Sequence, residues 1–201
     1  MTEPKGLITE PQRLRAISHP TRLAILEILD IDGAATATRC AELTGESVAS
    51  CSYHLGMLAK YGFVEPADGK GREKPWRLLQ REQSWTSEGM DPEGELAVEA
   101  LTETFIDHTA EQMKAAMRRS GREPERWRRA NGSSGATAHL TLDEALALRD
   151  ELLAIVNRYQ ERSTDPALRP PGSRPVRLFL ARWLARPYEG PAPQHDDEES
   201  S

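Results

Sequence analysis

The sequence predicts a mainly α protein of the α+β class, with four short helices and a β-hairpin in residues 10–82 and a helical extension after them. Two observations lead to this fold class. Up to residue 61, apolar residues recur at three- and four-residue spacing, which is typical of amphipathic helices. Two short apolar runs, 63–66 and 75–79, then flank a glycine-containing turn, which is the pattern of a hairpin.

The four helices are expected at 10–18, 20–32, 38–43 and 47–61. Pro20 suits the first turn of the second helix, and Gly33 suits its end. Ser47 is of a type that caps the fourth helix. In that fourth helix Cys51, Leu55 and Leu58 form the stripe that we expect to be buried. The opposite face is small or polar except for one aromatic ring, and it carries Ala49, Ser52, Tyr53, Gly56 and Lys60.

The second half, residues 94–185, is expected to hold a long helix at 94–119 after a linker at 84–93. Thr141 and Glu144 form a capping box that opens another helix, which extends to about residue 162. Short apolar runs at 137–140 and 176–184 are expected as strands on either side of it. We therefore predict a strand-helix-strand unit in a region that serves dimerisation and leaves room for an unidentified small-molecule effector.

The net charge of −6 is unevenly distributed. Residues 186–201 end in an acidic run, and we expect a disordered, solvated tail there. Residues 68–81 carry five Lys or Arg against two acidic residues, which is a positive strip suited to phosphate contact. Two cysteines cannot build a disulfide framework, so a cytoplasmic protein is the simple interpretation. No apolar run is long enough for a membrane span.

The first eighty residues resemble the ArsR-type winged helix-turn-helix transcriptional regulators. The residues that carry the resemblance are the runs 14–26 (LRAISHPTRLAIL), 41–45 (AELTG), 52–58 (SYHLGML) and 61–64 (YGFV). The extension more weakly resembles that of a subgroup of these regulators. The resemblance implies a dimeric repressor of transcription that binds double-stranded DNA at an inverted repeat.

The resemblance also implies which residues contact DNA. The third and fourth helices would form the helix-turn-helix, and the hairpin would be the wing. Lys70, Arg72 and Lys74 would contact phosphates or the adjacent minor groove. The residues implied on the fourth helix are Ser47, Ala49, Ser50, Ser52, Tyr53, His54 and Lys60.

The metal-sensing members carry a Cys-x-Cys pair in the third helix, where this chain has Thr36 and Thr38. Threonine is not a soft-metal ligand, so we expect no thiolate metal site and no cofactor. Cys40 and Cys51 are expected in the core, with a redox-sensing role as the alternative. His108 with Glu111 and Gln112 is only a weak indication of a metal site.

Three alternatives remain at the level of the sequence. His54 either contacts DNA or holds its helix against the domain. Trp127, Tyr159 and Trp183 either line a small-molecule pocket or pack structurally. The whole domain either binds DNA or is a winged protein-interaction module, because the central face of the fourth helix lacks the Arg, Lys, Asn and Gln that commonly contact bases. The chain shows no catalytic motif, so we do not expect an enzyme.

Overall fold

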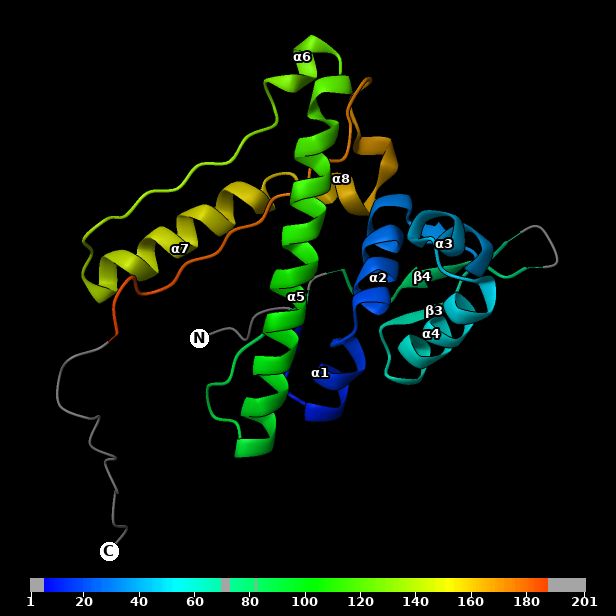
Figure 1. Cartoon of the computed structure of the whole chain (residues 1–201), viewed down its shortest axis with the longest axis horizontal. Coiled ribbons are helices and arrows are strands. Elements are labelled where there is room, and N and C mark those ends of the chain that lie inside the picture. Colours follow the sequence, from blue (N-terminus) through cyan, green and yellow to red (C-terminus); the bar gives the residue numbers. More distant parts are fainter. Residues whose placement is uncertain (1–5, 70–72, 82, 188–201) are drawn as a thin grey trace, which may run out of the picture.

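The structure is a computed structural model that describes residues 6–69, 73–81 and 83–187. It confirms the mainly helical fold class. Four short helices and a small sheet form one body, and the long helix α5 (Pro92–Arg119) crosses that body (Figure 1). The four short helices are α1 (Pro11–Ile17), α2 (Pro20–Asp32), α3 (Ala37–Thr44) and α4 (Val48–Lys60).

The hairpin strands β3 (Val64–Pro66) and β4 (Trp76–Leu78) pair antiparallel, with Glu65 opposite Arg77. A third strand, β2 (Ala34–Ala35), pairs with the other edge of β4. β1 (Leu7–Ile8) pairs in parallel with β5 (Ser84–Trp85), which lies inside the segment predicted as a linker. The sequence did not predict β1, β2 or β5, because two residues are too few to show an alternating pattern.

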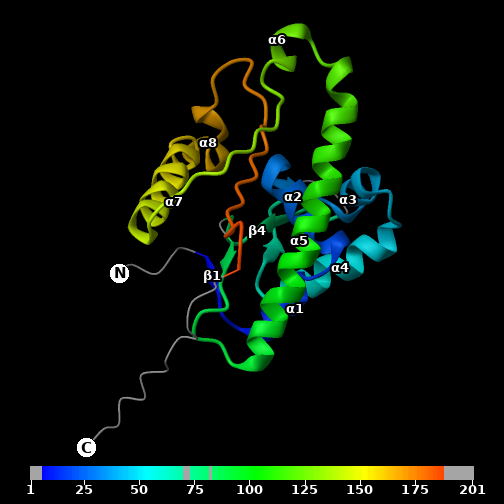
Figure 2. The ribbon, with the colours of Figure 1, turned by 60° about the vertical axis from the view of Figure 1, so that its left-hand side comes forward.

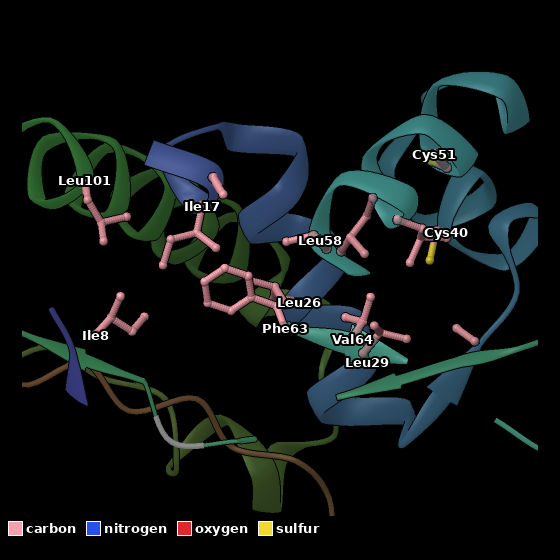
Figure 3. Close-up of a cluster of buried hydrophobic side chains, with 14 of the residues drawn as sticks. Ile8, Ile17, Leu26, Leu29, Cys40, Cys51, Leu58, Phe63, Val64 and Leu101 are labelled. Atoms are coloured by element: carbon pink, nitrogen blue, oxygen red, sulfur yellow. The ribbon is translucent and has the colours of Figure 1, made fainter. Parts of the chain in front are cut away.

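One apolar core connects the first body to α5 (Figure 3). Leu14 of α1, Leu29 of α2 and Leu58 of α4 are all fully buried in it. Ala97 and Leu101 of α5 belong to the same cluster. The N-terminal half of α5 is therefore part of the first domain, and its C-terminal half extends past α2 (Figure 2).

Helix α5 begins at Pro92, two residues before the predicted start. The Asp91 carboxylate accepts a hydrogen bond of 2.8 Å from the Gly94 backbone N–H, which caps the helix. A 3₁₀ turn, η1 (Ser120–Arg122), and the short α6 (Glu125–Arg128) follow its end.

The predicted capping box is confirmed at the start of α7 (Leu142–Asn157). The Glu144 carboxylate accepts from the Thr141 backbone N–H at 2.8 Å, and the Thr141 hydroxyl accepts from the Glu144 N–H at 3.3 Å. The helix ends at Asn157 rather than near residue 162. The short α8 (Glu161–Thr164) and the 3₁₀ turn η2 (Pro166–Leu168) come after it.

The predicted strands at 137–140 and 176–184 are wrong, because both described segments lack strand structure. A strand requires a neighbouring strand for its backbone hydrogen bonds, and neither segment has one. Side chains hold the second segment instead. The Phe179 ring lies 6.0 Å from the Phe105 ring, and Arg177 Nη1 lies 4.0 Å from Glu27 Oε1.

Most of the predicted acidic tail, residues 188–201, lies outside the described residues. None of the described helices combines the length and the apolar character that crossing a membrane requires.

Candidate nucleic-acid interface

Helices α3 and α4 are joined by a tight turn with defined caps at both ends. The Thr36 hydroxyl accepts from the Arg39 backbone N–H at 3.2 Å and begins α3. Gly45 ends α3 at φ +79°, a left-handed conformation that favours glycine. Two residues later the Ser47 hydroxyl accepts from the Ser50 N–H at 3.0 Å and begins α4. The predicted cap at Ser47 is thus confirmed, and the two helices are held at a defined angle.

The buried face of α4 is the predicted one. Cys51, Leu55 and Leu58 are fully buried, and so is Cys40 on α3. The Thr44 hydroxyl lies 3.6 Å from Cys51 Sγ, which adds a polar contact between the two helices. Because this face packs into the core, the opposite face of α4 is held toward solvent.

The solvent face of α4 is small and polar around one ring. Ala49, Ser52, Gly56 and Lys60 are exposed on it. The Tyr53 ring is 63 % exposed, which is high for an aromatic side chain. Lys60 Nζ lies 5.2 Å from the Tyr61 ring. This face therefore offers hydroxyl groups, one ring and a cation to whatever it contacts.

Gly56 has no structural explanation within the folded chain. A Cβ at this position would meet nothing within 4 Å. Glycine in a helix costs about 1 kcal/mol relative to alanine. The position is therefore suboptimal for stability and open to the close approach of another surface.

His54 lies away from this face. Its side chain is 8 % exposed, and its ring lies 4.6 Å from the His19 ring. His19 caps α2, since its Nδ1 accepts from the Thr21 N–H at 3.2 Å. Of the two interpretations given to His54, its position fits the structural one, in which it joins α4 to the start of α2.

The surroundings of both histidines disfavour protonation. Burial lowers the pKa of His54, and the nearby His19 and Arg22 lower it further, while Glu46 opposes them. Burial and Arg22 likewise lower the pKa of His19. Within the described residues, His54 Nδ1 and Arg22 Nε are buried without a hydrogen-bond partner.

The base of the wing is well ordered by contacts. The Ala67 N–H donates to the Pro75 carbonyl at 2.8 Å, and Arg77 pairs with Glu65 at 2.7 Å across the two strands. Trp76 packs against the core and anchors the wing. Lys74 is exposed. Lys70 and Arg72 lie outside the described residues.

Sequence reasoning missed Val48, the first residue of α4. Its side chain is partly exposed beside Ala49, although its type is typical of a core. Only its position one residue after the cap, before the buried stripe begins, would have indicated this. An exposed methyl group there suits contact with a thymine methyl.

The remaining candidate groups do not form a second site of the predicted kinds. His108 pairs with Glu27 rather than with Glu111. Trp127 contacts Arg174 and Tyr159 contacts Arg162, while Trp183 is exposed. In the described ranges, no three His, Cys, Asp or Glu side chains are grouped as metal ligands would be.

Residues 17–67 match a family described as a helix-turn-helix domain. The chain contains a helix-turn-helix domain. The match begins at the end of α1 and ends just after β3, so it includes α3, α4 and the turn between them. No curated protein matches the chain.

Solved structures offer further likenesses. Reduced HlyU from Vibrio cholerae N16961 is 21 % identical over 45 % of this chain and 81 % of its own, with a TM-score of 0.30. A protein described as a possible transcriptional regulator for arsenical resistance is 28 % identical over 47 % and 83 %, with a TM-score of 0.31. A mutant form of ZitR from Lactococcus lactis is 17 % identical over 70 % and 75 %, with a TM-score of 0.30.

Proposed function

We propose that this protein is a sequence-specific, DNA-binding transcriptional regulator of the ArsR type that acts as a homodimeric repressor. The observation that carries the proposal is the solvent face of α4. A recognition helix must be anchored on one side and open on the other, and α4 has a fully buried stripe opposite small and hydroxyl-bearing side chains.

In the proposed complex, α4 enters the major groove. Ser52 and Tyr53 contact base edges, and the methyl groups of Val48 and Ala49 suit thymine. Ser47 and Ser50 lie at the N-terminus of α4, where backbone N–H groups favour a phosphate. Lys60 and the wing cations Lys70, Arg72 and Lys74 contact the phosphate backbone. Because α4 offers few bidentate base contacts, phosphate contacts supply much of the affinity.

The dimer follows from the symmetry of such sites. A two-fold dimer places two α4 helices in successive major grooves, about 34 Å apart, and so matches an inverted repeat. Helix α5 is the proposed dimerisation element, because it exposes apolar side chains beyond its core contacts. Occupancy of promoter DNA by such a dimer would block transcription.

A hollow on the described surface is the place that we propose for a small-molecule effector. A hollow of about 520 Å³ lies between α2, α3 and α5, with Ala24, Ile28 and Leu43 on its apolar side and Gln112 on α5. Pockets of this size hold drug-sized ligands. A ligand there would contact both the helix-turn-helix and α5. It would therefore change the angle between the two helix-turn-helix domains of a dimer.

The competing proposal is a winged protein-interaction module, favoured by the exposed Tyr53 and by the absence of long amide or guanidinium side chains on the α4 face. Selection of bound sequences from random DNA tests the choice. An inverted repeat is expected if the protein is a regulator. The absence of any preferred sequence at low salt would reject DNA recognition.

A triple variant of the wing, Lys70→Ala, Lys74→Ala and Arg72→Ala, tests the phosphate contacts. Each lost contact reduces the slope of log K against log salt by about 0.9 per monomer, so weaker and less salt-dependent binding is expected. The matched control removes three exposed arginines from the extended segment after α8, Arg169, Arg182 and Arg186, with the same change of charge. Equal effects of both variants would count against a wing contact.

A further inference from the structure

Helix α7 carries an apolar surface that stays exposed in the part of the chain that the structure describes. None of its residues is buried, and Leu142 at its start is 74 % exposed. Leu146 and Leu153, which are also exposed, lie on the same side of the helix at spacings of four and seven residues. Within the described ranges no helix or strand packs closely against α7. A helix of this length is marginal in water without a partner.

A second, partly exposed apolar stripe lies on the C-terminal half of α5. Ile106, Met113 and Met117 recur at spacings of seven and four residues, so they share one side of the helix. They are 40–48 % exposed, although the N-terminal half of the same helix is packed into the core. Both the α5 stripe and the α7 stripe face solvent in a single chain, so neither covers the other.

The charges beside the two stripes are opposite. Lys114 and Arg118 directly follow the two methionines of α5, and both are exposed. Residues 114–129 as a whole contain seven Lys or Arg and two Glu. Helix α7 contains four acidic residues and one Arg, with the exposed Asp143 and Asp150 beside its leucines. Exposed ion pairs add little affinity, but they select and orient a partner.

The connection between α6 and α7 is long and open. Residues 130–141 contain no helix or strand, and a chain of twelve residues spans up to about 40 Å. In both views α7 stands to one side of the body (Figures 1 and 2). The connection together with α7, here called the arm, is therefore long enough to reach a second chain.

We propose that α7 of one copy docks on the Ile106, Met113 and Met117 stripe of a second copy of this chain, and that two copies exchange these arms. A two-fold exchange covers both stripes of both copies and closes the assembly at two chains. This inference rests on the homodimer of the proposed function and names a contact that supports it.

Cysteine pairing tests the exchange directly. Met117→Cys and Leu146→Cys variants of the full chain are purified separately, with a mass tag on one of them, and are mixed under mild oxidation. A disulfide-linked heterodimer is expected on a non-reducing gel. The natural cysteines do not interfere, because Cys40 and Cys51 are fully buried.

The matched control replaces Leu146→Cys by Ala147→Cys, an exposed position on the polar side of α7. The heterodimer should then be at least tenfold less abundant. Equal yields from both mixtures would overturn the proposal. In the double variant Met117→Cys with Leu146→Cys, a monomer with an internal disulfide would overturn it as well, since that product requires docking within one chain.

A variant without cysteines gives a second measurement. Leu146→Asp lies outside the core, so the fold should be retained, and the dimer dissociation constant should rise at least tenfold. An unchanged constant would reject the contact. DNA binding measured on the same samples separates the two proposals. A crosslinked protein that selects no DNA sequence contradicts only the proposed function. A DNA-binding dimer that does not form the crosslink contradicts only the exchange of arms.

Discussion

His108 Nε2 lies 3.1 Å from Glu27 Oε2, and the two residues are 81 positions apart in the sequence. Their side chains are only 11 % and 15 % exposed, and they join α5 to α2. Arg177, from the extended segment after η2, lies 4.0 Å from the other oxygen of the same carboxylate. One largely buried carboxylate thus connects three segments of the chain.

We expect His108→Ala to destabilise the protein by about 1.5–3 kcal/mol, because it leaves a buried, charged acceptor without its main donor. The hydrogen bond from His108 lowers the pKa of Glu27, with the charges of Arg177 and His108 acting in the same direction and burial opposing them. A lowered carboxyl pKa gives stability that is present above the unfolded value and is lost as the pH falls through the folded value.

Urea unfolding between pH 2.5 and 7 measures this contribution. The difference between the variant and the natural chain should shrink below pH 4.5. Lys114→Ala, which breaks an exposed pair with Glu111, is the matched control and should cost less than about 0.5 kcal/mol. A difference that stays constant over the whole pH range would contradict the role given to Glu27.

The adjacent rings of His19 and His54 predict a second pH dependence, near neutrality. The lowered pKa values of His19 and His54 mean that the unfolded chain binds more protons than the folded chain below about pH 6.5. Stability should therefore fall as the pH decreases from 6.5 to 5. His54→Gln should flatten this fall, and His139→Gln, at an exposed position, should leave it unchanged. An increase in stability over that range would rule out the explanation.

Gly56→Ala should separate stability from DNA binding. The added methyl group meets open space, so the free energy of unfolding should rise by about 1 kcal/mol. If the backbone of α4 approaches base edges closely, the same methyl group should weaken operator binding about tenfold or more. Gly121→Ala, also into open space, is the control away from α4. Unchanged affinity in Gly56→Ala would place the DNA elsewhere.

The two cysteines should behave as core residues. Burial raises the pKa of Cys40 to about 11, with Cys51 and Asp32 contributing, so its thiol stays protonated at neutral pH. With Ellman's reagent at pH 8, both thiols should react roughly a hundredfold more slowly in the folded protein than in urea. Fast reaction of one thiol in the folded protein would restore the redox-sensing alternative.

The helices α1 to α5 and α7, the caps at Ser47 and Thr141 and the hairpin could be predicted because each depends on residues fewer than about fifteen positions apart. Periodicity and capping chemistry act at this range. The α4 face could be predicted for the same reason, since the buried stripe of Cys51, Leu55 and Leu58 defines its opposite side. The two incorrect strands in the extension had the right composition, but strand formation depends on a distant neighbour that composition does not supply.

Local structure and the residue types on each helix face therefore follow from the order of the residues alone. The tertiary structure was needed to show that His54 lies against His19, that His108 pairs with Glu27, and that no helix or strand of the described residues packs closely against α7. Burial and long-range pairing depend on which surfaces meet after folding. The spacing of residues along the chain defines the surface of each helix, but it does not determine which of these surfaces pack together.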